Sequence, residues 1–503
     1  MSQRDARSAD VVPLREATRA WFLISLQTFG GPAGQIAVMQ RTLVEERRWI
    51  GQQRFLFALS YCTLLPGPEA QQLATYVGWL LNGVRGALVA GILFVLPGVV
   101  TLLALSALYV GYGETTLLEG LFLGLAGAVV AIVVQAVTRL SRKALRHPAL
   151  VGLALASFVA LSVFGVPFPV VVLAAGVLGW ALGTRLPGLG AAPPPLADDG
   201  PAPLIGDEAL HTERPSTARS LRVLGLGLLL WAAPVAVAAA LAGRDSVFVD
   251  QGLFFGGTAV VTFGGAYAVL AFVAQQAVNV YGWLAPGEMV RGLALAETTP
   301  GPLVMVVQFV AFVGAYRDPG ALDPWLAAVL AALLTTWVTF VPCFVFILLG
   351  APYVERLRGN RALRTALTGI TAAVVGVIAS LAVYFAVHTL FTDTVRVDRG
   401  PLALELPVPA SLDPAALAVT ALGLLLVLGR GWPVLRTLGV CAVAGVVVHL
   451  LAVWALGRAA RPPRAAGPGE CGMAPCRSTS SRASAPPCTP TPSSPPPPPS
   501  SAT

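Results

Sequence analysis

The sequence predicts an all-α polytopic membrane protein made of two inverted-topology repeats with broken or re-entrant helices. Three observations carry this prediction: a strongly apolar composition, many apolar runs of membrane-spanning length, and a repeated pair of helix-breaking motifs. Of the 503 residues, 56% are hydrophobic and 12% are charged, and the mean hydropathy is +0.75. A soluble protein carries about 25% charged residues. The composition therefore excludes soluble enzymes, disordered proteins and disulfide scaffolds as classes.

Apolar runs set the expected number of membrane segments, because crossing a bilayer takes about 20 apolar residues. Six apolar runs have about this length, and three further runs are shorter. The first two of the short runs form either two short spans or one tight hairpin. We expect about 9 to 13 membrane segments in total. The long runs are 87–110, 118–138, 219–242, 325–349, 365–390 and 437–457, and the short runs are 148–163, 168–184 and 413–428.

An internal repeat is visible without any gap when the chain is shifted so that Thr28 falls on Thr262. Thr28-Phe29-Gly30-Gly31 then matches Thr262-Phe263-Gly264-Gly265, and Pro66-Gly67-Pro68 matches Pro300-Gly301-Pro302. In all, 11 of the 41 positions from Thr28 to Pro68 are identical. The repeat continues past an insertion near 317–325, where Val95-Leu96-Pro97 pairs with Phe340-Val341-Pro342. The spacing of both motifs predicts two homologous halves.

The distribution of arginine predicts the orientation of the halves. Arginine-rich loops are typical of the cytoplasmic side, and this pattern, rather than nucleic-acid binding, explains the net charge of +8. If the loops at 41–54, 85 and 139–146 are all cytoplasmic, segments 17–40 and 55–82 each enter and leave on the same side. The span 219–242 has no counterpart ahead of the first repeat, so the second repeat is inserted with opposite polarity. Arg458, Arg461 and Arg464 do not fit this arrangement, because it places them on the side of the membrane opposite the cytoplasm.

Composition divides the chain into five expected regions. A Pro-, Gly- and charge-rich stretch separates the repeats and indicates an aqueous linker, and the Pro- and Ser-rich C-terminus has too little apolar surface to fold. The regions are a cytoplasmic N-terminus (1–16), the first repeat (17–184), the polar linker (185–218), the second repeat with an additional leading helix (219–457) and a disordered tail (458–503).

The paired motifs predict a binding site for an oxyanion. Proline and glycine interrupt a helix, so Pro-Gly-Pro leaves free N–H groups at the start of the next half-helix. These donors and the helix dipole can hold an anion without a buried Lys or Arg, and paired broken helices are where secondary transporters bind substrates. Amide and hydroxyl groups near the breaks could orient the anion: Gln35, Gln71, Gln72, Thr298, Thr299 and Gln308. The same amides could instead bond backbone across helices.

Two acidic side chains near the breaks are proton-coupling candidates. A carboxylate at membrane depth is costly and indicates function, and burial favours its protonated form. Glu69 and Glu297 fall on Leu303 and Thr63 of the other half, so any proton role is asymmetric. Glu69 could equally stabilise the start of a helix, since it stands at the second position after Gly67.

The motif-bearing stretches, FGGPAGQIAVMQRTLVEERRWI with LLPGPEAQQLATYVGW and FGGAYAVLAFV with LAETTPGPLVMVVQFVAFVGA, closely resemble the chromate ion transporter family in its long, two-domain form. The resemblance covers roughly residues 15–457. It implies a secondary transporter of the bacterial cytoplasmic membrane that exports chromate, gives chromate resistance and uses the proton motive force. The implied substrate-binding positions are Phe29, Gly30, Gly31, Pro32, Gln35, Pro66, Gly67, Pro68, Glu69, Gln71, Gln72, Phe263, Gly264, Gly265, Pro300, Gly301, Pro302 and Gln308. Ala266 departs from the pattern, because it stands where the first motif has Pro32.

Other functions are weighed against this one. A carrier for sulfate or another oxyanion is the nearest alternative, and a non-transporting scaffold or a chromate-reducing enzyme is the third. The sequence has no nucleotide-binding or hydrolase motif, and the four histidines are far apart. We therefore expect no enzyme activity, no cofactor, no metal site and no nucleic-acid partner, with chromate and the lipid bilayer as partners. A homodimer is left open.

Overall fold

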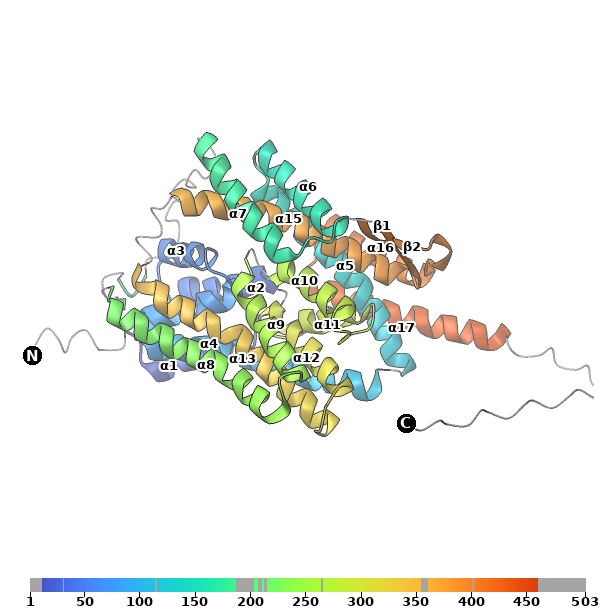
Figure 1. The fold of residues 1–503 in the computed structure, drawn as a ribbon, viewed down its shortest axis with the longest axis horizontal. Coiled ribbons are helices and arrows are strands. Elements are labelled where there is room, and N and C mark those ends of the chain that lie inside the picture. The colour runs from blue at the N-terminus through green and yellow to red at the C-terminus, as the bar shows by residue number, and fades with distance from the viewer. Residues whose placement is uncertain are drawn as a thin grey trace, which may run out of the picture. The chain divides into compact units, whose positions relative to one another are not determined.

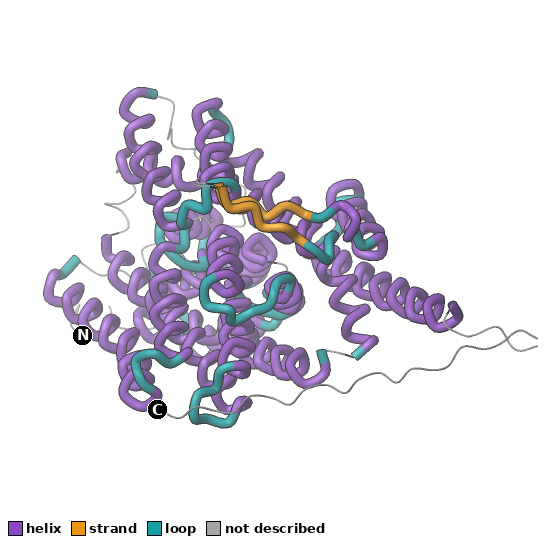
Figure 2. The backbone as a smooth tube through the Cα atoms, turned by 45° about the vertical axis from the view of Figure 1, so that its right-hand side comes forward, coloured by secondary structure: helices purple, strands orange, loops and turns teal. Residues whose placement is uncertain are grey.

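The chain is helical over almost all of its described length (Figures 1 and 2). The computed structural model describes residues 11–29, 31–113, 115–186, 203–206, 210–211, 215–263, 266–353, 361–399 and 402–459. The prediction of an all-α polytopic membrane protein is confirmed, with one exception among these residues. Strands β1 (Thr394–Arg399) and β2 (Leu402–Pro407) form an antiparallel hairpin.

Seven helices in the described part of the chain are long and apolar enough to cross a membrane. Together they contain all six long runs predicted from the sequence. Their outer faces are apolar: α8 buries only Gly227, and Leu229 and Leu241 on it are exposed in the isolated chain, as expected of side chains that face lipid. The seven are α4 (Glu69–Tyr112), α5 (Thr116–Ala144), α7 (Phe168–Arg185), α8 (Thr217–Ala242), α13 (Pro324–Gly350), α15 (Arg361–Leu390) and α17 (Val434–Ala459).

The three short apolar runs are also helices. The first two form α6 (Pro148–Ser162) and α7, which are joined by a turn at 163–167 and pack against α15. Gly179 of α7 meets Gly369 of α15, and the absence of side chains there lets the two backbones approach closely. The third run forms α16 (Pro414–Leu424), which continues as a π-helical turn over Leu425–Gly429.

Each of the four repeated motifs lies at a break between two helices. The helices flanking the breaks are 10 to 15 residues long apart from α4, so each spans about 15–22 Å, less than the roughly 30 Å of a bilayer core. These are the broken segments that the sequence predicts. In the first half they are α1 (Leu14–Ser25), α2 (Gly31–Gln40), a π-helical extension (Arg41–Glu46), α3 (Gln52–Cys62) and α4. In the second half they are α9 (Val247–Val261), α10 (Ala266–Asn279), α11 (Glu288–Thr298), a 3-10 turn (Leu303–Met305) and α12 (Val306–Arg317).

Helix α4 itself is divided by a kink. Asn82 and Gly83 leave helical geometry, and Gly83 has a positive φ of 57°. The Asn82 side-chain amide donates to the Val12 carbonyl at 2.6 Å, so the kink lies against the segment that precedes α1. The first part of α4 thus completes the second broken pair, and the part after the kink is a full span.

Part of the chain between the repeats packs on the first repeat, although the sequence predicts an aqueous linker there. Leu210 is 3% exposed and belongs to the apolar core formed by α1 to α4. The His211 N–H donates to the Leu80 carbonyl at 2.7 Å, and its ring contacts Trp79 edge-on. Leu210, an apolar residue within a polar stretch, is therefore buried against the apolar core of the first repeat. The predicted disordered tail lies outside the described residues beyond Ala459.

Candidate functional site

The broken segments of the two halves are joined by a reciprocal pair of backbone hydrogen bonds. The Gly67 N–H donates to the Thr262 carbonyl at 2.7 Å, and the Gly301 N–H donates to the Thr28 carbonyl at 3.0 Å. Since the gap-free repeat matches Thr28 with Thr262 and Gly67 with Gly301, the two bonds are equivalent. Each Pro-Gly-Pro break therefore lies against the Thr-Phe-Gly-Gly break of the other half.

A second equivalent pair of contacts surrounds the glycines. A methyl group built on Gly301 would lie 3.4 Å from the Cα of Gly98, and one built on Gly67 would lie 2.8 Å from the sulfur of Cys343. Gly98 and Cys343 each follow the proline inside a long helix, Pro97 of α4 and Pro342 of α13. Both motif glycines also have positive φ, 121° at Gly67 and 104° at Gly301, a conformation that other residues adopt only under strain. Conformation thus favours glycine at both positions, and space also favours it at Gly67, whereas a methyl group at Gly301 would make only ordinary van der Waals contacts.

The glycine amides at the breaks are occupied, which differs from the expectation that they are free. Their N–H groups are the donors of the reciprocal pair, because the facing carbonyls of Thr28 and Thr262 lie within hydrogen-bond distance. The start of a helix leaves N–H groups of its first turn without intrahelical partners, and such starts follow both Pro-Gly-Pro breaks, where α4 begins at Glu69 and the 3-10 turn begins at Leu303.

The four predicted amide side chains are all buried around the breaks. Gln35 donates to the Gly301 carbonyl at 2.5 Å, Gln308 to the Val99 carbonyl at 3.1 Å and Gln72 to the Pro66 carbonyl at 2.6 Å. Gln71 donates to the Thr75 hydroxyl at 3.1 Å. In this conformation three of the four amides bond backbone, which is the structural alternative that the sequence left open. The carbonyl oxygens of Gln71 and Gln72 have no hydrogen-bond partner among the described residues.

The two acidic side chains lie in different environments. Glu297 is 1% exposed, near the end of α11, and accepts a hydrogen bond from the Tyr267 hydroxyl at 2.5 Å through Oε1. Its Oε2 has no partner among the described residues. Glu69 is only half-buried and is the first residue of α4, where a carboxylate favours the helix start. Glu297 is therefore the more deeply buried carboxyl group of the two.

Tyr267 is a site residue that the sequence analysis missed. It follows the second Thr-Phe-Gly-Gly motif closely, in the first turn of α10. A methyl group built on Gly31 would lie 3.8 Å from its hydroxyl oxygen, so Tyr267 reaches from the second half to the break of the first. The repeat could not indicate it, because the equivalent position is Ala33.

The structure brings together most of the other predicted positions. Thr298 and Thr299 direct their hydroxyls to carbonyls of their own helix, Leu295 and Ala296. Phe263 packs on the main apolar core. Phe29, Gly31, Pro32, Pro66, Pro68, Pro300 and Pro302 lie in or next to the four breaks, whereas Gly30, Gly264 and Gly265 lie outside the described residues.

A multi-pass helical protein whose paired helix breaks meet at one centre has the architecture of membrane transport proteins. The chain belongs to the chromate transporter family, whose profile matches residues 15–180 and 249–447. This confirms the resemblance found in the sequence. No solved structure matches the chain.

Three curated relatives share long stretches with this chain. The chromate transport protein of Pseudomonas aeruginosa is 33% identical over 358 residues, which cover 70% of this chain and 76% of the relative. The chromate transport protein of Cupriavidus metallidurans is 28% identical over 384 residues, covering 76% and 85%. A probable chromate transport protein of Synechococcus elongatus is 27% identical over 414 residues, covering 80% and 94%. The similarity extends over most of both chains in each case.

Proposed function

We propose that this protein is a secondary active transporter that exports chromate across the bacterial cytoplasmic membrane and gives chromate resistance. The proton motive force drives the export. Family membership and the names of the curated relatives support chromate as the substrate. The observation that carries the site is the reciprocal pair of hydrogen bonds from Gly67 to Thr262 and from Gly301 to Thr28.

In this proposal the two glycine amides exchange partners during transport. While the breaks are in contact, each N–H is satisfied by a threonine carbonyl. When one set of segments moves against the other, the amides are released and can donate to chromate oxygens. The first-turn donors of the following helices add to them, and the helix dipole favours a dianion there. Gln72 and Gln308, which each hold a backbone carbonyl nearby, are the side-chain donors for the same anion.

Opposite insertion of the two repeats would make this movement an alternating-access step. Contacts at the helix ends support it. The kink at Asn82 lies against Val12, next to loops rich in arginine. The Tyr109 hydroxyl, near the other end of α4, donates to Glu288 at the start of α11. In this proposal the broken pairs of the first half open toward the arginine-rich side, and those of the second half open toward the opposite side.

Coupling to protons is assigned to Glu297. Its burial, its single bond to Tyr267 and its unpartnered Oε2 among the described residues fit a carboxyl group that gains and loses a proton during the cycle. Exchange of a proton for chromate at neighbouring positions would link the inward proton gradient to outward transport of the anion.

The deciding experiment is uptake of labelled chromate into energised inside-out vesicles that contain this protein. We expect accumulation that a proton uncoupler abolishes and that excess sulfate barely reduces. Vesicles with the Gly301→Val variant, at equal protein in the membrane, are the control and should accumulate no chromate. Absence of accumulation by the unaltered protein would contradict the proposal.

Sulfate is the second candidate substrate, because it is also a tetrahedral dianion. Strong competition by sulfate in the same vesicles, or sulfate uptake into right-side-out vesicles, would favour it over chromate.

A further inference from the structure

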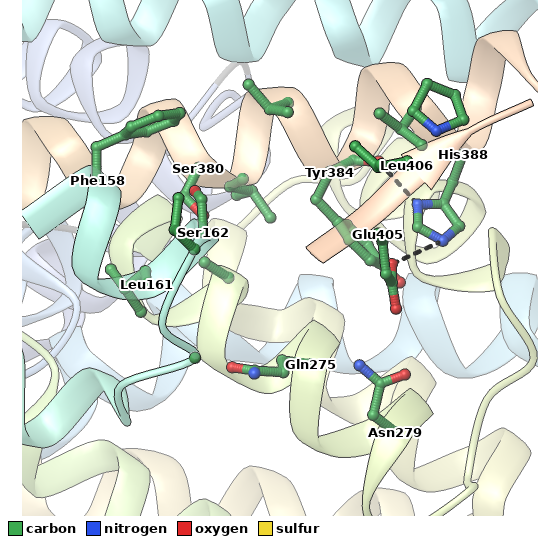
Figure 3. A pocket seen from close by; sticks show the side chains of 17 residues that line it. Phe158, Leu161, Ser162, Gln275, Asn279, Ser380, Tyr384, His388, Glu405 and Leu406 are labelled. Atoms are coloured by element: carbon green, nitrogen blue, oxygen red, sulfur yellow. Dashed lines mark hydrogen bonds and ion pairs between the residues drawn. The ribbon is translucent and has the colours of Figure 1, made fainter. Parts of the chain in front are cut away.

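A cavity of about 420 Å³ lies beside α10, away from the four breaks. Figure 3 shows it between α6, α10, α15 and β2. Several polar side chains face it, and two contacts join its walls. The Ser162 hydroxyl of α6 and the Ser380 hydroxyl of α15 are 2.9 Å apart, and His388 Nε2 of α15 is 3.7 Å from a Glu405 carboxylate oxygen of β2. Most of the lining surface is apolar, and the polar side chains that face the cavity are those of Ser162, Gln275, Asn279, Ser380, His388 and Glu405. A cavity of this size has room for several water molecules, and these side chains are the groups that can hold them.

One face of α10 connects the cavity with the buried acid. Tyr267, Ala271, Gln275 and Asn279 recur at every fourth position, which places neighbouring members on the same side of the helix. The last three line the cavity, and Tyr267 is bonded to Glu297. Along the helix, Gln275 is about 12 Å from Tyr267, and Ala271 lies on the same face one turn from each. The cavity lining therefore ends one helical turn from the tyrosine that is bonded to Glu297.

The charges that line the cavity favour a cation over an oxyanion. Glu405 contributes a carboxylate and His388 an imidazole, and none of the cavity-lining residues is Lys or Arg. A carboxylate repels chromate but stabilises a hydrated proton, and chains of acidic and histidine side chains are typical of proton relays in membranes.

The neighbouring titratable groups are consistent with such a relay. The His388 Nδ1 lies 2.9 Å from the Tyr384 carbonyl, and the Tyr384 ring lies against His388. The cavity thus has an acid and a base at its hairpin end, and a tyrosine hydroxyl bonded to an acid beyond its other end.

From this arrangement we infer that the cavity is a proton pathway between the β-hairpin side of the membrane and Glu297. A hydrated proton passes His388 and Glu405, moves through water along the Ala271, Gln275 and Asn279 face of α10, and is transferred to Glu297 Oε2. A new O–H bond forms there and a water molecule is left behind. This pathway rests on the proposed function, since it supplies the proton that export consumes.

Blocking the pathway should separate proton coupling from chromate binding. In proteoliposomes with the full chain, we expect Ala271→Phe and Gln275→Leu to reduce pH-gradient-driven chromate transport roughly 100-fold, the scale of losing a positioned proton-transfer group. Chromate/chromate exchange without a pH gradient should stay within about twofold of the unaltered protein, roughly 0.4 kcal/mol. Val280→Phe is the matched control, because Val280 directly follows α10, is 64% exposed and does not line the cavity.

The outcomes distinguish the two proposals. If the unaltered protein shows no pH-gradient-driven chromate transport, the proposed function fails. If it does, and both variants keep that transport, the pathway is wrong. Equal loss of exchange and of driven transport would also overturn it, because the variants would then have damaged the carrier itself.

Water access gives a second measurement that does not depend on activity. In a chain whose six cysteines are replaced by alanine, we expect cysteines at positions 271, 275 and 279 to react with a membrane-impermeant thiol reagent added from the β-hairpin side. A cysteine in place of Ala274, which is 1% exposed and not part of the cavity, is the control. Absence of labelling at positions 271 and 275, or labelling there no faster than at position 274, would overturn the pathway.

Discussion

The two broken-helix halves are equivalent at the centre, where they meet, and different at their outer ends. At the centre each half contributes one glycine N–H and one threonine carbonyl to a pair of equivalent bonds. At its outer end the first half is fixed by other parts of the chain, through the bond from Asn82 to Val12 and the one from His211 to Leu80. The second half is closed by its own charges: Arg317 of α12 donates to Glu288 of α11 at 2.7 and 2.9 Å.

The equivalence at the centre and the difference at the outer ends therefore come from different contacts. Gly67 and Gly301 make equivalent hydrogen bonds to a threonine carbonyl of the other half. Both halves therefore have glycine at this position. The ends face different neighbours, so the residues equivalent to Glu288 and Arg317 are Arg54 and Gly83, which cannot form the same pair. The buried acid also breaks the symmetry, because Glu297 has Thr63 as its equivalent.

The largest expected effect is at the matched glycines. A methyl group at Gly301 would make ordinary van der Waals contacts with the backbone of Gly98 and Phe94, whereas one at Gly67 would lie 2.8 Å from the Cys343 sulfur and 2.9 Å from the Gln72 amide nitrogen. Both carry a left-handed backbone cost of about 1–3 kcal/mol. We expect Gly301→Ala and Gly67→Ala both to lose chromate transport in vesicles.

Rescue should distinguish the two glycine variants. Removing the sulfur with Cys343→Ala should restore part of the transport of Gly67→Ala, because that clash is with a side chain. The same change should do nothing for Gly301→Ala. Equal rescue of both variants would contradict the contacts described here.

The next effect concerns the two acids. Because Glu297 is fully buried and Glu69 is not, we expect Glu297→Gln to remove the uncoupler-sensitive part of chromate transport while chromate exchange persists. Glu69→Gln, the matched change at the half-buried acid, should keep uncoupler-sensitive transport. Initial rates with and without uncoupler measure both. Retained coupling in Glu297→Gln together with lost coupling in Glu69→Gln would reverse the assignment.

A smaller effect is expected at the ion pair that closes the second half. Burial opposes ionisation of Glu288, but hydrogen bonds from Arg317, Tyr109 and the Ala285 N–H outweigh it and hold the pKa of Glu288 below its usual 4.5. The pair therefore stabilises the fold fully above about pH 4.5, and this stability is lost as the pH falls through the lower, folded-state pKa. Arg317→Ala should reduce the free energy of unfolding by about 2 kcal/mol at pH 7.

Thermal unfolding in detergent across pH 3 to 7 measures this contribution. Glu288→Gln should flatten the acid dependence that the unaltered protein shows. Glu46→Gln breaks an exposed pair with Arg41 and should change the unfolding temperature little, since exposed pairs contribute about 0–1 kcal/mol. Asn82→Ala, at the outer end of the first half, removes the hydrogen bond to the Val12 carbonyl. This change should reduce the free energy of unfolding by about 1 kcal/mol, without acid dependence, because neither group titrates.

Much of this molecule could be predicted from local signals in the sequence. Apolar runs of membrane length fix the spans, because a helix satisfies its own backbone in lipid. Proline and glycine fix the breaks, because they remove a donor and permit positive φ. The gap-free repeat also paired Gly67 with Gly301 and Thr28 with Thr262, which are the residues that the central hydrogen bonds use.

Other features depend on residues that meet only in the folded chain. Tyr267 lies on a different helix from Glu297 and in the opposite half from Gly31, and no spacing in the sequence indicates either contact. The β-hairpin that brings Glu405 to His388 was not predicted either. Its two strands are only six residues long and lie between two apolar runs that predict helices. The glycine amides were expected to be free and are bonded, because local sequence shows which groups a break exposes but not which carbonyls lie opposite. Composition and periodicity determined the elements and their breaks, whereas the packing of one half against the other decided the partners of each buried polar group.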